Sequence, residues 1–207
     1  MLEPGFHWSV GDDSDYGGQG AGAIFSNCER IEVYVGDELL EKLEPGRERF
    51  PNLPHPPFFF STLAGTAPGR RAWGDLRLDG FIGGERVVSR EFSGRGADHS
   101  FHLEPDDVDL VGDGVDATRV VFRVTDEFGA PRPFATGVIV LGIEGPGEIL
   151  GENPFALVGG AGAVWFRSGE GEGEILLRAQ HPVLGHKTAA LRVVGAPREL
   201  DEGPPRA

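Results

Sequence analysis

The chain has 207 residues, enough for one large domain or two of ordinary size, and its 39% apolar content supports a packed core rather than global disorder. The formal net charge of −14 repels phosphate groups, which excludes nucleic-acid partners and disfavours an anionic membrane surface. No apolar run approaches the roughly 20 residues that a membrane-spanning helix needs. The 33 glycines and 16 prolines favour many turns and short strands over long helices.

In the first half of the chain, strand-like runs are separated by glycine, proline and aspartate at intervals of about ten residues. The run RIEVYV, residues 30–35, alternates and places its aliphatic side chains on one face. PNLPHPPFFFS, residues 51–61, predicts a proline-stiffened loop that leads into a short aromatic strand. The run at residues 75–92 predicts a hairpin that turns at Gly83 and Gly84.

The second half contains four longer alternating runs, each with one apolar face. The residues predicted to face inward are Thr118, Val120, Phe122 and Val124; Ile139, Leu141 and Ile143; Ile175, Leu177 and Ala179; and Ala189, Leu191 and Val193. A period of two with one apolar face is typical of a sheet that packs on a second sheet. The sequence therefore predicts an all-β fold of two consecutive immunoglobulin-like β-sandwich domains.

The boundary between the two sandwiches is predicted near Leu103, because the polar, turn-forming stretch EPDD follows and strands resume on either side. We expect one sandwich at residues 1–103 and an immunoglobulin-like sandwich at residues 104–196. Residues 197–207 have little apolar surface to bury and are predicted to form a disordered tail.

Cys28 is the only cysteine, which excludes an intrachain disulfide and a multi-cysteine metal site. A catalytic thiol needs a nearby base and a setting that favours the thiolate, whereas Glu29 and Glu32 disfavour it. We therefore expect a buried or half-buried structural cysteine. The first ten residues lack the basic start and apolar segment of a signal peptide, which slightly favours a cytoplasmic location.

The acidic stretch GDDSDYGG resembles the beginning of a calcium loop, but Gly17 and Ile24 occupy positions where an EF-hand needs ligands. A looser oxygen site at Asp12, Asp13 and Asp15 is a weak metal candidate, against the simpler interpretation of a solvated acidic loop. The stretch GQGAGA fits the dinucleotide fingerprint formally but lacks its preceding strand and following helix, so we expect no cofactor. None of the histidine spacings is typical of a metal site.

Exposed aromatic side chains could form a platform for sugars, although large aromatics more often build cores. The candidates are Trp8, Tyr16, Phe58, Phe59, Phe60, Trp73 and Trp165. Strand alternation places Phe58 and Phe60 on one side and Phe59 on the other, so one of these sides is expected to be exposed.

Several stretches together resemble the bacterial β-galactosidases of glycoside hydrolase family 2. FSNCERIEVYVGDELL, FPNLPHPPFFF and GDLRLDGFIGGERVVSREF are similar, in this order, to segments that follow the catalytic barrel. DLVGDGVDATRVVFRVTDEFGAPRPFA, IEGPGEILGENP and GEILLRAQHPVLGHKTAALRVV are similar to the terminal immunoglobulin-like module. The resemblance covers residues 5–195, and the order of the motifs carries it more than any single one.

The resemblance implies a parent enzyme that hydrolyses terminal β-galactosides or related glycosides with retention of configuration. In that family both catalytic glutamates lie on a (β/α)₈ barrel, which needs roughly 250 residues and so exceeds this chain. The acid/base glutamate of the family lies in an Asn-Glu-Pro motif, whereas this chain has the order Glu152-Asn153-Pro154. We therefore assign no catalytic residue, and expect the chain to brace the barrel of the parent chain, to contribute to homo-oligomer contacts, or to shape the active-site entrance.

If one part of the chain reaches substrate, we expect it to be the loop from Pro51 to Phe60. The side chains predicted to lie near substrate are His55, Phe58, Phe59 and Trp73. The alternative is a stand-alone carbohydrate-binding or adhesive immunoglobulin-like module that binds through Trp73 or Trp165. A third interpretation, a hydrolase complete in itself, predicts turnover of a nitrophenyl galactoside by this chain.

Overall fold

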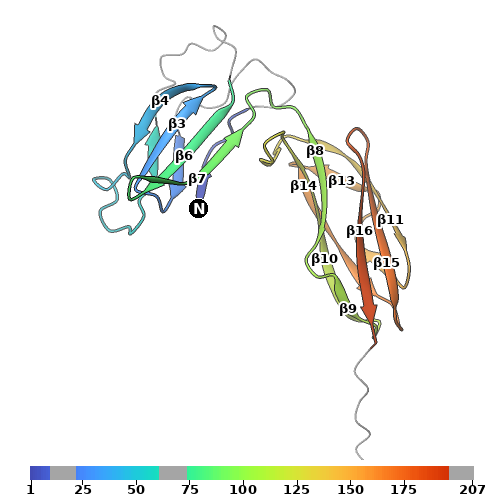
Figure 1. The fold of residues 1–207 in the computed structure, drawn as a ribbon. Coiled ribbons are helices and arrows are strands. Elements are labelled where there is room, and N and C mark those ends of the chain that lie inside the picture. Colours follow the sequence, from blue (N-terminus) through green and yellow to red (C-terminus); the bar gives the residue numbers. More distant parts are fainter. Residues whose placement is uncertain (10–21, 61–73, 196–207) are drawn as a thin grey trace, which may run out of the picture. The chain divides into compact units, whose positions relative to one another are not determined.

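The computed structural model describes residues 1–9, 22–60 and 74–195, and all regular structure within them is β-strand (Figure 1). The chain forms two compact units, one from Met1–Ser100 together with Val124–Ala135, the other from Phe101–Arg123 and the residues from Thr136 onward. The predicted all-β fold of two immunoglobulin-like sandwiches is confirmed. The described part of the chain contains no helix long and apolar enough to cross a membrane. The predicted tail, residues 197–207, lies outside the described residues.

Two sheets form the first unit. One has the order β1-β2-β5 and consists of β1 (Leu2–Pro4), β2 (Gly22–Ser26) and β5 (Phe58–Phe60). The other has the order β4-β3-β6-β7 and consists of β3 (Arg30–Val35), β4 (Glu38–Leu43), β6 (Leu76–Ile82) and β7 (Glu85–Phe92). The core of this unit contains Leu2, Phe6, Trp8, Ile24, Ile31, Val33, Leu43, Phe58, Phe60, Leu76 and Leu78. The alternating runs of the first half therefore supply one apolar face to each sheet.

Glycines close the two hairpins of the larger sheet. Gly83 (φ +59°) and Gly84 (φ +83°) join β6 to β7, and positive φ at both central residues is what a two-residue type I′ turn requires. The predicted hairpin at these residues is confirmed. Gly36 (φ +57°) joins β3 to β4, so this hairpin also forms, with a register shift between Val33 and Tyr34.

Cys28 lies buried beside the larger sheet, with 5% of its surface exposed. A Cβ atom placed on Gly80 of β6 would come within 2.6 Å of the Cys28 sulfur and 2.8 Å of Val88 Cγ1. The thiol therefore fills the space that the missing side chain of Gly80 leaves. The burial expected for this cysteine is confirmed.

The second unit contains a four-stranded and a five-stranded sheet. The first, of order β12-β14-β10-β8, consists of β8 (Ser100–Pro105), β10 (Ala117–Thr125), β12 (Gly147–Leu150) and β14 (Ala161–Ser168). The second, of order β13-β11-β15-β16-β9, consists of β9 (Asp109–Val111), β11 (Thr136–Glu144), β13 (Phe155–Val158), β15 (Gly173–His181) and β16 (Gly185–Val194). The β9–β16 pair is parallel. The residues predicted to face inward on β10, β11, β15 and β16 are buried or half-buried.

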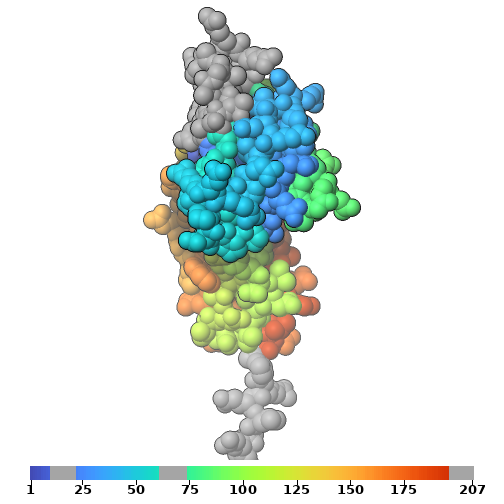
Figure 2. Space-filling view, turned by 90° about the vertical axis from the view of Figure 1, so that its left-hand side faces the viewer, coloured from blue at the N-terminus to red at the C-terminus, as the bar shows by residue number. Residues whose placement is uncertain are grey.

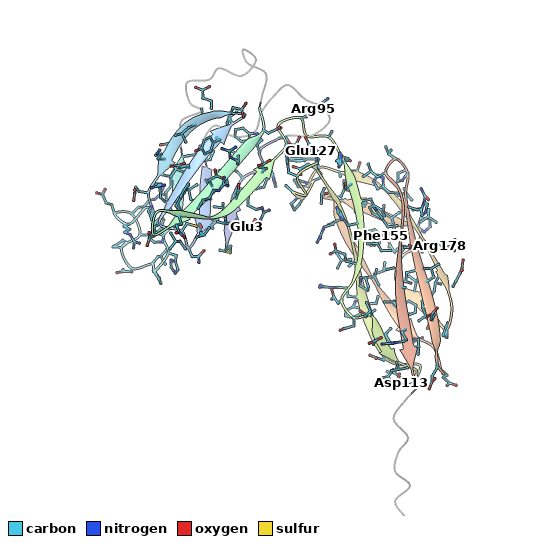
Figure 3. The ribbon with its side chains drawn as sticks, viewed as in Figure 1. Glu3, Arg95, Asp113, Glu127, Phe155 and Arg178 are labelled. Atoms are coloured by element: carbon cyan, nitrogen blue, oxygen red, sulfur yellow. The ribbon has the colours of Figure 1, made fainter. Side chains whose placement is uncertain are left out.

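Phe155 and Asp113 of this unit, both labelled in Figure 3, take part in aromatic packing and in a local turn respectively. Phe155 meets Phe122 edge-on with ring centroids 4.9 Å apart, and the lack of a side chain at Gly162 leaves room for both rings. After β9, Asp113 accepts the backbone N–H groups of Val115 and Asp116, each at 2.8 Å. These two hydrogen bonds lower the pKa of Asp113, and the bond from Asp116 has the larger effect.

Candidate functional site

Two carboxylates lie side by side on the larger sheet of the first unit. Glu32 of β3 and Asp79 of β6 are cross-strand partners, on the face opposite to the one that packs into the core. Glu32 is 8% exposed and Asp79 is 2% exposed. A retaining glycosidase uses two neighbouring carboxylates, so Glu32 and Asp79 are a candidate catalytic pair among the described residues.

The partners of Glu32 keep it ionised. Its carboxylate accepts a hydrogen bond of 2.8 Å from the Tyr34 hydroxyl, and Lys42 and Arg30 lie at 3.1 and 3.4 Å. The Tyr34 hydroxyl and, after it, Lys42 and Arg30 lower the pKa of Glu32, while burial acts in the opposite direction. The same hydrogen bond raises the pKa of Tyr34, because it favours the protonated phenol. A general acid needs a raised carboxyl pKa. The pKa of Glu32 is lowered instead, which does not suit that role.

Asp79 has a separate set of partners. The Ser89 hydroxyl donates to its Oδ1 at 2.6 Å, and Arg77 and Arg86 lie at 3.3 and 3.4 Å from its Oδ2. The Arg77 guanidinium also lies 4.1 Å from the centre of the Tyr34 ring, which joins this set to that of Glu32. The sequence predicts that Arg30, Glu32 and Tyr34 share a face, but not that Asp79 lies opposite. That fact depends on the register between two strands far apart in the chain.

The first unit also contains a pocket of about 490 Å³. Phe6, His7 and Trp8 line it from the first segment, Arg90 and Phe92 line it from β7, and part of the turn between Asp126 and Pro133 completes it. Glu3 at its rim is bonded to Arg90 at 2.5 Å. The lining combines aromatic walls with polar groups, which is typical of a site that binds a ligand or a polypeptide segment.

The carboxylate of Asp126, which lines this pocket, is bound to backbone groups of the turn. It accepts backbone N–H groups from Ser93 at 2.9 Å, Phe128 at 3.0 Å and Ala130 at 2.8 Å. The other carboxylate of the described lining, Glu3, is paired with Arg90. The described lining of the pocket therefore offers no carboxylate that is ready to act as a base or nucleophile.

Arg132 is the second buried charge of this turn, with 4% of its surface exposed. Its guanidinium donates to Asp98 Oδ1 at 3.2 Å, to Ser9 Oγ at 3.0 Å and to the carbonyl oxygen of Gly96. A buried guanidinium needs such a set of acceptors to offset the loss of water. Arg132 thus connects segments far apart in sequence, and no short motif indicates that role.

The loop predicted to lie near substrate is closed by backbone contacts at its base. Gly46 donates to the carbonyl of Pro57 at 2.9 Å, and Pro45 forms a bridge with Phe58. The loop lies at the surface of the first unit, where its residues are cyan in the space-filling view (Figure 2). The loop therefore lies at the surface, and backbone hydrogen bonds hold its two ends together.

The three phenylalanines after this loop alternate as predicted. Phe58 is fully buried in the core and Phe60 is 3% exposed, whereas Phe59 is 38% exposed. The Phe59 ring stacks on Phe50 at 6.0 Å, and the Arg49 guanidinium lies 4.9 Å from its centre. His55 is exposed. His55 and Phe59 are thus available to a ligand, while Phe58 is part of the core.

The remaining predicted site residues lie outside the described residues. These are Trp73 and the weak metal candidates Asp12, Asp13 and Asp15. Among the residues that the structure describes, no group of three or more His, Cys, Asp or Glu side chains is arranged to hold a metal ion.

Glu152 and Asn153, which invert the order of the family's catalytic motif, differ in their surroundings. Asn153 Oδ1 accepts the backbone N–H of Leu141 at 3.0 Å, and its Nδ2 donates to the Leu141 carbonyl at 2.8 Å. The Asn153 amide therefore pairs with β11 as a neighbouring strand would. Glu152 is exposed.

Comparison with protein families and known proteins identifies the kind of protein to which this chain is similar. The family model described as "Glycoside hydrolase family 2 C-terminal domain 5" matches residues 101–190. The chain is 39% identical over 160 residues to a β-galactosidase of Thermoanaerobacter pseudethanolicus, and the match covers 76% of this chain and 22% of that protein. It is 32% identical over 107 residues to a β-galactosidase of Rhizobium radiobacter, covering 52% of this chain and 78% of that sequence.

Among solved structures, a β-glycosidase from Bacteroides vulgatus has a similar fold. The TM-score is 0.72 at 19% identity, and the match covers 93% of this chain and 24% of the other. The chain thus spans about a quarter or less of the length of this structure and of the Thermoanaerobacter protein.

Proposed function

Because this chain belongs to glycoside hydrolase family 2, as part of the C-terminal region of a β-galactosidase, we propose that it is a non-catalytic accessory region of an enzyme that hydrolyses terminal β-galactosides. The observation that carries the proposal is the 39% identity to a β-galactosidase of which the matched region is only 22%. The catalytic barrel of such an enzyme needs roughly 250 residues, which this chain does not contain.

The described carboxylates support the non-catalytic part of the proposal. Glu32 and Asp79 are cross-strand neighbours, and each is neutralised by its own cations and a hydroxyl group. Asp126 is occupied by three backbone donors. Such groups brace strands and turns, and none is arranged as an acid facing a nucleophile.

The partner in this proposal is the catalytic barrel of the parent chain, and the role is mechanical. Two sandwiches with separate cores, one predicted at residues 1–103 and the other at residues 104–196, offer rigid surfaces for the barrel or for a second subunit. The loop from Pro51 to Phe60 is proposed to reach toward the active-site entrance, with His55 and Phe59 as the side chains that contact substrate. The exposure of both side chains supports this assignment.

The proposal is tested on the whole enzyme by deleting the region that corresponds to this chain. We expect the deleted enzyme to unfold at a lower temperature and to lose kcat/KM for a nitrophenyl β-galactoside, because the barrel loses the surfaces that brace it. A control enzyme that carries the exposed substitution Val183→Ala should keep both properties. A deleted enzyme with unchanged stability and unchanged kinetics would reject the accessory role.

A further inference from the structure

A tryptophan lies exposed in the middle of the four-stranded sheet of the second unit. Trp165 is 53% exposed, the largest exposed fraction among the described phenylalanine and tryptophan side chains. It lies on β14, a strand with a neighbour on each side. Its cross-strand partners are Arg119 on β10 and Leu150 on β12. The neighbouring residues Val164 and Phe166 are buried, so the indole lies on the outer face of the sandwich.

Small side chains surround this indole along its own strand. Ala163 and Ala161 precede Trp165 at intervals of two, so they share its face, and Ala163 lies opposite Val121. Neither alanine is large enough to cover an indole ring. On the side toward Ala163, the indole therefore stands above smaller side chains, while Arg119 and Leu150 lie beside it on the neighbouring strands.

Three ion pairs lie on the same face as the tryptophan: those of Arg119 and Arg167 lie next to it, and that of Arg123 lies opposite Ala161. Arg119 donates to Asp106 at 2.9 and 3.4 Å, Arg123 donates to Glu104 at 2.8 Å, and Arg167 is bonded to Glu148. The side chains of all six residues are between 42% and 53% exposed, so their unused donors and acceptors face water. The three positive and three negative charges cancel, although the whole chain carries a net charge of −14.

We propose that this face, centred on Trp165 and framed by the pairs of Arg119 and Arg167, binds a neutral glycan. One face of a pyranose ring presents C–H groups, which stack on an indole, while its hydroxyl groups point outward along the ring edge. Paired guanidinium and carboxylate groups at that edge donate and accept hydrogen bonds without attracting a net charge. Because each arginine is already held by its carboxylate, little side-chain freedom is lost when a sugar binds.

The same features argue against a protein partner at this face. A stable protein interface buries about 800 Å² on each partner around an apolar centre that is depleted of charged residues. Here three ion pairs share the face of a single indole, and a protein partner would have to strip them of water, a cost that their attraction only partly offsets. A bound sugar is smaller than a protein partner, so it leaves those arginine and carboxylate atoms that it does not contact in water.

The experiment is calorimetric titration of the full chain with soluble β-1,4-galactan, a soluble β-glucan and polygalacturonate. The choice of galactan rests on the proposed function, whereas the glucan tests the surface independently of it. We expect a neutral glycan to bind and Trp165→Ala to weaken that binding by about tenfold or more. Phe25→Ala, which removes an exposed aromatic of the first unit, should bind like the unaltered chain.

Several results would overturn the inference. These are absence of binding to both neutral glycans, equal binding by the Trp165→Ala chain, or binding to polygalacturonate alone. Self-association of the chain that Trp165→Ala abolishes, seen by analytical ultracentrifugation, would show that the face joins two copies of this chain instead. Binding of the glucan but not of galactan would support the Trp165 surface while counting against a galactoside-specific parent, so the two proposals fail separately.

Discussion

Glu32 and Asp79 lie opposite each other on β3 and β6, and among the described residues each carboxylate has its own set of donors and cations. Like charges directly opposite on a sheet destabilise it, so the pair depends on the cations that flank it. Lys42 on β4 and Arg86 on β7 supply these charges from the two outer strands. The ion network therefore joins all four strands across the outer face of the sheet.

The first prediction concerns the pH dependence that Glu32 confers. Its pKa is lowered in the folded chain, first by the Tyr34 hydroxyl, so its contribution is complete above the ordinary glutamate pKa of about 4.3. That contribution is lost as the pH falls through the lowered folded-state pKa. Glu32→Gln should therefore lower the melting temperature of the first unit by roughly 2–5 °C at pH 7. The difference from the unaltered chain should shrink toward zero in acid.

The control for this prediction is Glu44→Gln, which alters an exposed glutamate of the same unit. Thermal unfolding followed by circular dichroism at a series of pH values gives both curves. A Glu32→Gln difference that stays constant or grows in acid would contradict the assignment of Glu32 as a stabilising carboxylate.

The second prediction concerns the packing of Cys28 against Gly80. Gly80→Ala should destabilise the chain by about 1–3 kcal/mol, because the new methyl group meets the sulfur and Val88. Adding Cys28→Ala should relieve part of this cost, since the sulfur is removed while Val88 remains. Urea unfolding of the two single variants and the double variant measures the coupling.

The matched control is Gly142→Ala, where the nearest atom to the new methyl group is Arg178 Cβ at an ordinary 3.9 Å. This variant should unfold within about 0.5 kcal/mol of the unaltered chain. If the effects of Cys28→Ala and Gly80→Ala simply add, the sulfur does not occupy the space beside Gly80.

The third prediction separates the two polar residues of the Glu152-Asn153-Pro154 stretch. Asn153→Asp keeps the acceptor for Leu141 but removes the donor to its carbonyl, so we expect a loss of about 1–2 kcal/mol in urea unfolding. Glu152→Gln alters an exposed neighbour and should change neither stability nor the kinetics of the whole enzyme. Loss of kcat with Glu152→Gln would instead assign a catalytic role to this stretch.

The fourth prediction tests the loop between Pro51 and Phe60 in the whole enzyme. His55→Ala combined with Phe59→Ala should raise KM for the natural glycoside roughly three- to tenfold and leave kcat near its original value. Leu53→Ala, which removes another exposed apolar side chain of the loop, serves as the control. If the double variant has unchanged kinetics, the loop does not contact substrate.

Local patterns predicted the features that depend on a few neighbouring residues. The turn at Gly83 and Gly84 needs only positive φ at two glycines, and the opposite exposure of Phe58 and Phe59 follows from strand alternation. The buried position of Cys28 follows from its small apolar character.

Features that depend on register or on distant segments could not be predicted in this way. Asp79 meets Glu32 only because β6 pairs with β3 in one particular register, and a shift of one residue would place it on the other face. Arg132 reaches Ser9 across 123 positions of sequence, which no spacing rule anticipates. The exposure of Trp165 depends on which side chains the two neighbouring strands place beside it, and sequence alternation alone does not give that.

The most direct test of the account is the activity of this chain alone. The purified 207-residue chain is incubated with a nitrophenyl β-galactoside beside the whole enzyme at equal molar concentration. We predict that the whole enzyme releases nitrophenol and that the chain releases none above the buffer rate. Turnover by the chain that Glu32→Gln or Asp79→Asn abolishes would contradict the central claim, because it would place a working pair of catalytic carboxylates within these residues.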